Sequence, residues 1–89
     1  MEALIKEKLH SLANNIRSFR LIRNYSQDYL ALKLKISQNA YSKIELGYTR
    51  VTVERLLGIA HVLEVSLMEL FEQPKHDSKI AHQRYNFGA

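Results

Sequence analysis

The chain has 89 residues, enough for one small domain with a modest hydrophobic core. It contains no cysteine, which excludes disulfides and cysteine-based zinc sites and favours a cytoplasmic location. The net charge is +4, and no apolar run approaches the ~20 residues of a membrane-spanning helix, so no membrane partner is indicated. The charge is uneven. Residues 17–55 hold eight Lys and Arg against three acids, whereas residues 56–74 hold three acids and no Lys or Arg. Such a division of charge suits phosphate binding on one side of the molecule, although a chance distribution of surface charges would also produce it.

Residues 2 to 23 are predicted to be helical, because apolar side chains recur at alternating steps of four and three. The positions are Ile5, Leu9, Leu12, Ile16 and Phe19. Either one long helix covers the stretch, or it breaks near His10 and Ser11 caps a second helix. We expect Ile5 and Leu9 to pack on the domain's own core, and a dimer contact at a protruding helix end is the alternative.

The next two helices are short and lie on either side of a tight turn. Ser26 is expected to cap a helix over Gln27–Leu34, and Ser37 a helix from Gln38 to about Leu46, because serine oxygens accept bonds from free amides. Gly47 ends the second helix, since glycine tolerates the left-handed conformation. The side chains expected to point into the core are Leu30, Ala31, Leu34, Ile36, Tyr41 and Ile44.

Two further helices follow the loop 47–51. Thr52 is the predicted cap of Val53 to about Leu63, and Ser66 is the predicted cap of a last helix, Leu67 to Glu72. That last helix is expected to bury Leu67, Leu70 and Phe71. The tail after Pro74, residues 75–89, is polar apart from a few side chains, and it is either disordered or a short extended arm.

The ordered set of motifs resembles the phage repressor/Cro (XRE-like) helix-turn-helix family over residues 16–72. The motifs that carry the resemblance are Ile16-Arg17…Arg20, Ser26-Gln27…Leu30-Ala31, Ile36-Ser37…Tyr41-Ser42…Glu45-Leu46-Gly47 and Leu56…Ile59-Ala60…Leu63-Glu64-Val65-Ser66…Leu70. The resemblance implies an all-α, compact five-helix bundle of the lambda-repressor-like type. We therefore divide the chain into a helical extension at 1–15, a DNA-binding domain at 16–74 and a tail or dimerisation arm at 75–89.

The resemblance also implies a function: a sequence-specific regulator of transcription, a repressor, that inserts the helix 38–46 into the major groove of a double-stranded operator. Base-facing positions match Gln38, Asn39 and Lys43. Amide side chains offer a donor and an acceptor together, which suits the adenine edge, whereas a lysine suits guanine or phosphate. The residues expected at the phosphate backbone are Gln27, Ser42, Tyr48, Thr49, Arg50, Arg17 and Lys35.

A structural ion pair between Arg20 and Glu45 is implied as well. An acid on a helix that faces DNA would repel phosphate unless a cation neutralised it, and a solvated surface acid is the alternative. The family often has glycine at the positions of Lys35 and Glu64, so both residues are expected to have positive φ. Tyr41 stands where the family more often has Ile or Val.

Two copies related by a two-fold axis would read a palindromic operator, so a homodimer is expected. Candidate dimer contacts are Val65, Leu67, Met68, Phe71, Tyr85 and Phe87, with Ile5 and Leu9 as the competing surface. The four histidines lack metal-ligand spacing, and no catalytic arrangement stands out, so we expect no metal, no cofactor and no enzymatic activity.

Two other functions use the same fold. One is the antitoxin of a toxin–antitoxin pair, whose tail 75–89 would fold on a toxin partner. The other is a protein-interaction module that does not read DNA. The polar tip formed by Gln38, Asn39 and Lys43 argues against that second alternative.

Overall fold

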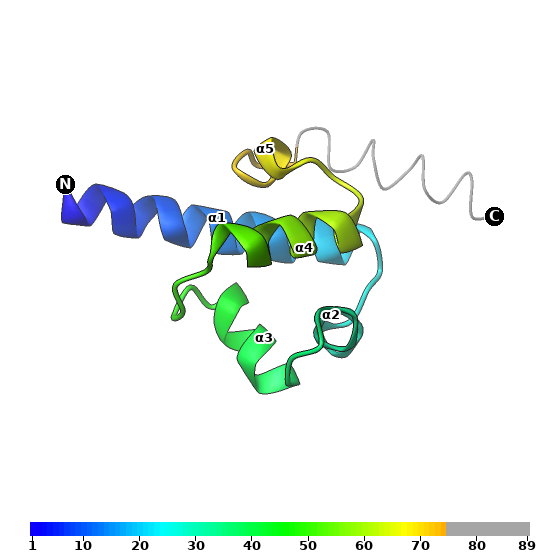
Figure 1. Cartoon of the computed structure of the whole chain (residues 1–89). Helices are drawn as coiled ribbons and strands as arrows, with labels where there is room; N and C mark the ends of the chain where they lie inside the picture. Colours follow the sequence, from blue (N-terminus) through cyan, green and yellow to red (C-terminus); the bar gives the residue numbers. More distant parts are fainter. Residues whose placement is uncertain (75–89) are drawn as a thin grey trace.

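The computed structural model describes residues 1–74, and within them the chain forms five α-helices and no strand (Figure 1). Their bounds are α1 Glu2–Ile22, α2 Gln27–Leu34, α3 Gln38–Glu45, α4 Val53–Leu63 and α5 Leu67–Leu70. Helices α1 and α4 lie side by side in the middle, with the α2–α3 pair packed on one side and α5 on the other (Figure 1). The predicted all-α five-helix bundle is confirmed.

Each helix after the first begins at a predicted capping residue. The hydroxyl oxygens of Ser26, Ser37, Thr52 and Ser66 each accept a hydrogen bond from the backbone amide three residues ahead. At Ser66 the bond is reciprocal, because the Glu69 carboxylate also accepts from the Ser66 amide at 2.8 Å. The predicted starts of α2, α3, α4 and α5 are therefore confirmed, since a cap depends on neighbours in the sequence alone.

The helix ends confirm the expected strain. Lys35 ends α2 with φ 61° and Glu64 ends α4 with φ 60°, in the left-handed region that glycine occupies more easily. A third residue of this kind, Asn24 with φ 61°, lies between α1 and α2 and was not predicted. Asparagine tolerates this conformation because its short side chain bonds locally.

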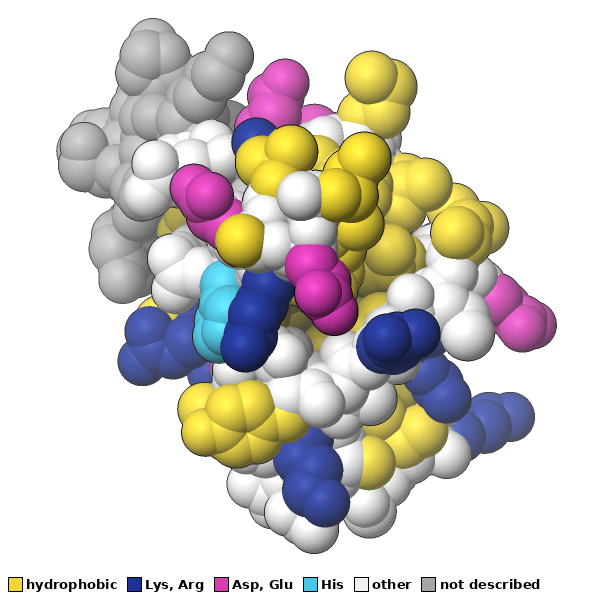
Figure 2. Space-filling view, turned by 90° about the vertical axis from the view of Figure 1, so that its left-hand side faces the viewer, with side chains coloured by type: hydrophobic (Ala, Val, Ile, Leu, Met, Phe, Trp, Pro, Cys, Tyr) yellow, Lys and Arg dark blue, Asp and Glu magenta, His cyan; other side chains and the backbone are white. Residues whose placement is uncertain are grey.

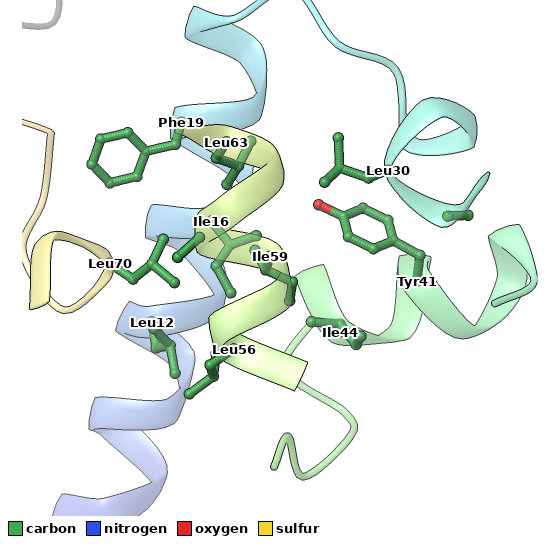
Figure 3. Packing of buried hydrophobic residues seen from close by; sticks show 12 residues of the cluster. Leu12, Ile16, Phe19, Leu30, Tyr41, Ile44, Leu56, Ile59, Leu63 and Leu70 are labelled. Carbon is green, nitrogen blue, oxygen red and sulfur yellow. The ribbon is translucent and has the colours of Figure 1, made fainter. Parts of the chain in front are cut away.

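The core lies where α1, α3 and α4 meet (Figure 3). Tyr41 extends from α3 toward Leu30 on α2 and Ile59 on α4, and none of the three is exposed. Helix α4 comes close to α2 at Gly58, where an added Cβ would lie 3.2 Å from the Leu34 side chain. The helix-turn-helix pair is thus held to the rest of the bundle by apolar contact on its inner side.

Several predictions about burial and helix length were wrong. Ile5 and Leu9 do not pack on the domain's own core, because α1 projects past the other helices and leaves them 50% and 42% exposed (Figure 1). Of the two alternatives for residues 2–23, one long helix is confirmed: α1 runs unbroken through His10, and Ser11 caps nothing. Helix α5 ends at Leu70 rather than Glu72, which turns Phe71 outward to 59% exposure.

Two leucines on α2 test this packing. Leu30→Ala should lower the free energy of unfolding by about 2–5 kcal/mol, because Leu30 is fully buried and its loss leaves a cavity. Leu32→Ala on the same helix should change it by less than about 0.5 kcal/mol, since Leu32 is 74% exposed. Urea unfolding followed by circular dichroism measures both, and equal losses would contradict the packing.

Candidate nucleic-acid interface

The first turns of α3 present three polar side chains to solvent. Gln38, Asn39 and Lys43 are all exposed, whereas Tyr41 and Ile44 on the opposite side of the helix are buried. The arrangement follows from the helical repeat, which places residues 38, 39 and 43 on one side. Because Ser37 caps α3 just before this turn, the amides stand at the exposed tip of a fixed helix.

A buried network joins α3 to α1 and α2. Arg20 on α1 meets the carboxylate of Glu45 at two points, with its Nε donating to Oε2 at 2.6 Å and its Nη2 donating to Oε1 at 3.0 Å. Its third nitrogen, Nη1, donates to the Tyr25 carbonyl oxygen at 2.8 Å. Both side chains are almost fully buried, 9% and 2% exposed. Such two-point bonding fixes direction as well as distance.

Two further donors complete the coordination of Glu45. The phenol of Tyr41, one turn earlier on α3, donates to Oε2 at 2.5 Å, and Gln27 at the start of α2 donates from Nε2 to Oε1 at 3.0 Å. The carboxylate therefore accepts four hydrogen bonds from three helices. Because its charge is satisfied inside the protein, it does not stand free on the face beside Gln38 and Lys43.

The network sets the pKa values of its members. Burial alone would raise the pKa of Glu45, but hydrogen bonds from Arg20, Tyr41 and Gln27 outweigh it and hold that pKa below its usual range. The bond to Glu45 raises the pKa of Arg20. Burial, and then the hydrogen bond to Glu45, raise the pKa of Tyr41 far above that of a free phenol. All three groups thus keep one protonation state near neutral pH.

A hollow of about 460 Å³ lies beside α3, between its exposed side, the loop 47–52 and the start of α4. Three cationic side chains, Lys43, Arg50 and Arg55, line it together with the hydroxyl groups of Ser37, Thr49 and Thr52. Cations and hydroxyls are the groups that contact phosphate oxygens in DNA complexes. The hollow is therefore lined by groups that suit the phosphate backbone of DNA, and it lies next to the exposed amide side chains of α3.

The other residues predicted at the DNA backbone lie in different settings. Tyr48, Thr49, Arg50, Lys35 and Arg17 are exposed, and Ser42 is half-buried. Gln27 is also half-buried. Its amide nitrogen donates to Glu45 on α3, and this is the contact by which Gln27 supports α3. Figure 2 shows most Lys and Arg side chains over the lower half of the face it views, with hydrophobic side chains gathered above.

Three side-chain hydrogen bonds were not predicted from the sequence. The Tyr41 hydroxyl bonds Glu45, Asn15 on α1 donates to the Leu70 carbonyl oxygen at 3.0 Å, and Arg55 on α4 donates to the Leu34 carbonyl oxygen at 3.2 Å. The first of these bonds could have been found from the sequence, because Tyr41 and Glu45 are four residues apart on one helix and their side chains are therefore neighbours. Asn15 lies next to Ile16 in the buried stripe of α1, where a polar residue needs a partner.

Residues 1–74 contain no cluster of three or more His, Asp or Glu side chains that could hold a metal ion. Over the same residues, no helix combines the length and the apolar character needed to cross a membrane.

Comparison with known proteins gives one match. The model of a helix-turn-helix family matches residues 16–70, which spans α2 and α3 as well as most of the bundle around them. No curated protein and no solved structure matches the chain.

Removing the cation tests the buried network. Arg20→Gln should lower the free energy of unfolding by about 3–5 kcal/mol, because it leaves the Glu45 charge buried without its cation. Arg17→Gln is the matched control, because Arg17 lies on the same helix but is exposed, and substitution of an exposed side chain changes the free energy of unfolding by less than about 0.5 kcal/mol. Chemical denaturation at pH 7 measures both, and similar losses would contradict the assigned role of Glu45.

Acid should remove part of the stability. The pKa of Glu45 is lower in the folded chain than its ordinary value of 4.5, so its contribution is complete above that value and is lost as the pH falls through the native pKa. Glu45→Gln should be less stable than wild type at pH 7, and the gap should narrow below about pH 4. Urea unfolding of both proteins between pH 7 and pH 3 measures this, and a constant gap would count against it.

Proposed function

Because the chain belongs to the XRE-type helix-turn-helix family of DNA-binding regulators, we propose that it is a sequence-specific repressor of transcription. It acts as a homodimer that inserts α3 of each copy into the major groove of a palindromic operator. The observation that carries the proposal is the pairing of an exposed, amide-rich helix tip with an internally neutralised Glu45. Only with that acid neutralised does the face of α3 suit a polyanion.

Three side chains read the bases in this proposal. Gln38 and Asn39 each present a donor and an acceptor, which suits the N6 and N7 edge of adenine, and Lys43 reaches guanine or a phosphate. Their exposure on one side of α3 supports these roles. The buried carboxylate network below them holds the helix in one orientation, which sequence reading requires because each base contact depends on the direction of a bond.

The phosphate contacts come from both sides of α3. On one side, Thr49 and Arg50 in the loop and Lys43 line the hollow beside α3, and Tyr48 precedes them. Arg55 lines the same hollow, so we add it to the predicted set. On the other side, Gln27, Lys35, Ser42 and Arg17 are the proposed contacts. These groups fix the position of the protein on the duplex, and the amides supply the choice of sequence.

A homodimer is proposed because one motif of this size touches few base pairs, and two copies read half-sites about 10 bp apart. Among the dimer candidates, Met68 and Phe71 are 79% and 59% exposed, whereas Val65 and Leu67 are half-buried. Tyr85 and Phe87 lie outside the described residues, as does the proposed arm 75–89. The division into an extension 1–15 and a domain 16–74 remains a proposal, since α1 runs through it without a break.

A second candidate function is that of an antitoxin. The observation that favours it is the exposed apolar pair of Met68 on α5 and Phe71 directly after α5, away from α3 and next to the acids Glu69 and Glu72 in the sequence. Such a surface suits a basic protein partner. Co-purification of the product of the adjacent gene in a fixed stoichiometry would favour the antitoxin, and its absence from the purified protein would favour the repressor alone.

Selection from random double-stranded DNA at physiological salt tests the function directly. We expect enrichment of a palindrome, because two identical recognition helices would be related by a two-fold axis. Gln38→Ala should then weaken binding to the selected operator by about 1–3 kcal/mol and relax the preference at one base pair. Gln73→Ala, an exposed glutamine beyond α5, is the matched control and should change neither.

Arg50→Ala should behave differently in the same assays. It should weaken binding to operator and random DNA alike and reduce the slope of log affinity against log salt by about one unit, because it removes a phosphate contact. No enrichment of any sequence over bulk DNA would overturn the proposed function. An equal loss on operator and random DNA for Gln38→Ala would remove that residue from the base readers.

A further inference from the structure

Helix α1 carries a single apolar stripe of which only one half is covered. Leu12, Ile16 and Phe19 are buried in the core, and the same stripe continues toward the N-terminus at Leu9 and Ile5. There α1 has passed beyond the other helices, so these two side chains stay 42% and 50% exposed (Figure 1). A stripe that keeps its register past the edge of the domain is what a helix needs to pack against a further surface.

The uncovered half of the stripe forms one wall of a groove. The groove measures about 610 Å³ and lies between the first turns of α1 and the loop 47–50. Its apolar walls come from Ile5, Leu9 and Tyr48, and its charged rim comes from Glu2, Lys6 and Arg50. Figure 2 looks onto this end of the molecule and shows hydrophobic side chains gathered around the free end of α1.

We propose that a second copy of this chain occupies the groove, with the first three turns of the two α1 helices packed antiparallel about a two-fold axis near Ile5. The inference rests on the proposed homodimer and names its surface. Around such an axis Ile5 meets Ile5 of the second copy, and Leu9 lies opposite Met1 of that copy, so each helix covers the open stripe of the other.

Charge favours the antiparallel arrangement. Seen down α1, Glu2 and Lys6 lie on the same edge of the stripe, one turn apart. A two-fold axis near Ile5 brings Glu2 of one copy to within about one turn of Lys6 of the other, and it does so twice.

The apolar surface of α5 suits self-association less well. Met68 and Phe71 are more exposed than Ile5, but the acids Glu69 and Glu72 directly follow them in the sequence, and residues 56–74 contain no Lys or Arg. A two-fold axis through α5 would bring these acids face to face, which costs free energy. Residues 2–8 of α1, by contrast, carry two acids and two bases and can pair with themselves.

The exposed area is large enough for a specific but weak dimer. Met1, Leu4, Ile5, Leu9 and Tyr48 leave between 42% and 92% of their surface exposed. At on the order of 100 Å² each, they offer about 500 Å² per copy, and the total of about 1,000 Å² is the lower end of specific interfaces. We therefore expect self-association that depends on concentration in the free protein.

Sedimentation equilibrium of the free, full chain over a range of concentrations tests the inference without DNA. Ile5→Glu should raise the dimer dissociation constant at least about tenfold, because it puts a charge at the centre of the pair. Met68→Glu, at a still more exposed site on α5, should leave the dissociation constant unchanged. Circular dichroism verifies that each variant is folded, which we expect because neither side chain belongs to the core.

A charge exchange tests the register. Glu2→Lys alone and Lys6→Glu alone should each weaken the dimer, and the double variant should restore it, because it keeps both the net charge and the opposite pairing. Loss of the dimer in Met68→Glu but not in Ile5→Glu would overturn the α1 surface and leave the proposed homodimer standing. A monomer at every concentration would overturn both, and a double variant as weak as the single ones would overturn the antiparallel register. None of these outcomes decides whether the chain reads DNA, which the selection experiment measures.

Discussion

The bond between Arg20 and Glu45 is the constraint on which the rest of the structure depends. It joins α1 to α3 in the core of the bundle, and Gln27 adds α2 to the same carboxylate. Removing two charges from water is expensive, so the pair is a poor source of net stability. What it supplies is orientation. The planar guanidinium of Arg20 bonds the planar carboxylate of Glu45 at two points, and Gln27 bonds the same carboxylate, so α1, α2 and α3 are held in one relative arrangement. A helix that reads bases needs such a fixed orientation.

The network also explains why the exposed face of α3 can be polar and free of negative charge. Glu45 sits at the end of the helix that carries Gln38, Asn39 and Lys43, yet its oxygens are occupied by four donors. Tyr41 contributes twice, since its ring fills the core beside Leu30 and its hydroxyl bonds the carboxylate. The site and the core are therefore not separate parts of this small domain, because the same side chains build both.

The three exposed surfaces differ in charge and so suit different binding partners. The cations around the hollow beside α3 suit phosphate, the mixed charges on the free end of α1 suit a second copy, and the acids around α5 suit neither. Loop 47–50 lies between the first two surfaces, with Arg50 lining both the hollow and the groove along α1. The proposed dimer surface and the proposed contact with the DNA backbone thus share one short loop.

The sequence by itself determined the helices and their starts. Ser26, Ser37, Thr52 and Ser66 each bond an amide only three residues away, and the positive φ of Lys35 and Glu64 follows from the local end of a helix. These features depend on near neighbours, so a pattern along the chain predicts them. The family resemblance added the pairing of Arg20 with Glu45, which no local rule would have supplied.

Only the tertiary structure decided what lies opposite each face. Periodicity marks Ile5, Leu9 and Phe71 as members of apolar stripes, but it cannot say where the neighbouring helix stops, and all three proved exposed. The bonds of Asn15 to Leu70 and of Gln27 to Glu45 join residues 55 and 18 positions apart, so they too required the fold. The chain's pattern therefore determined which sides of its helices are apolar, and the place where the bundle ends along α1 decided which of those sides stayed exposed.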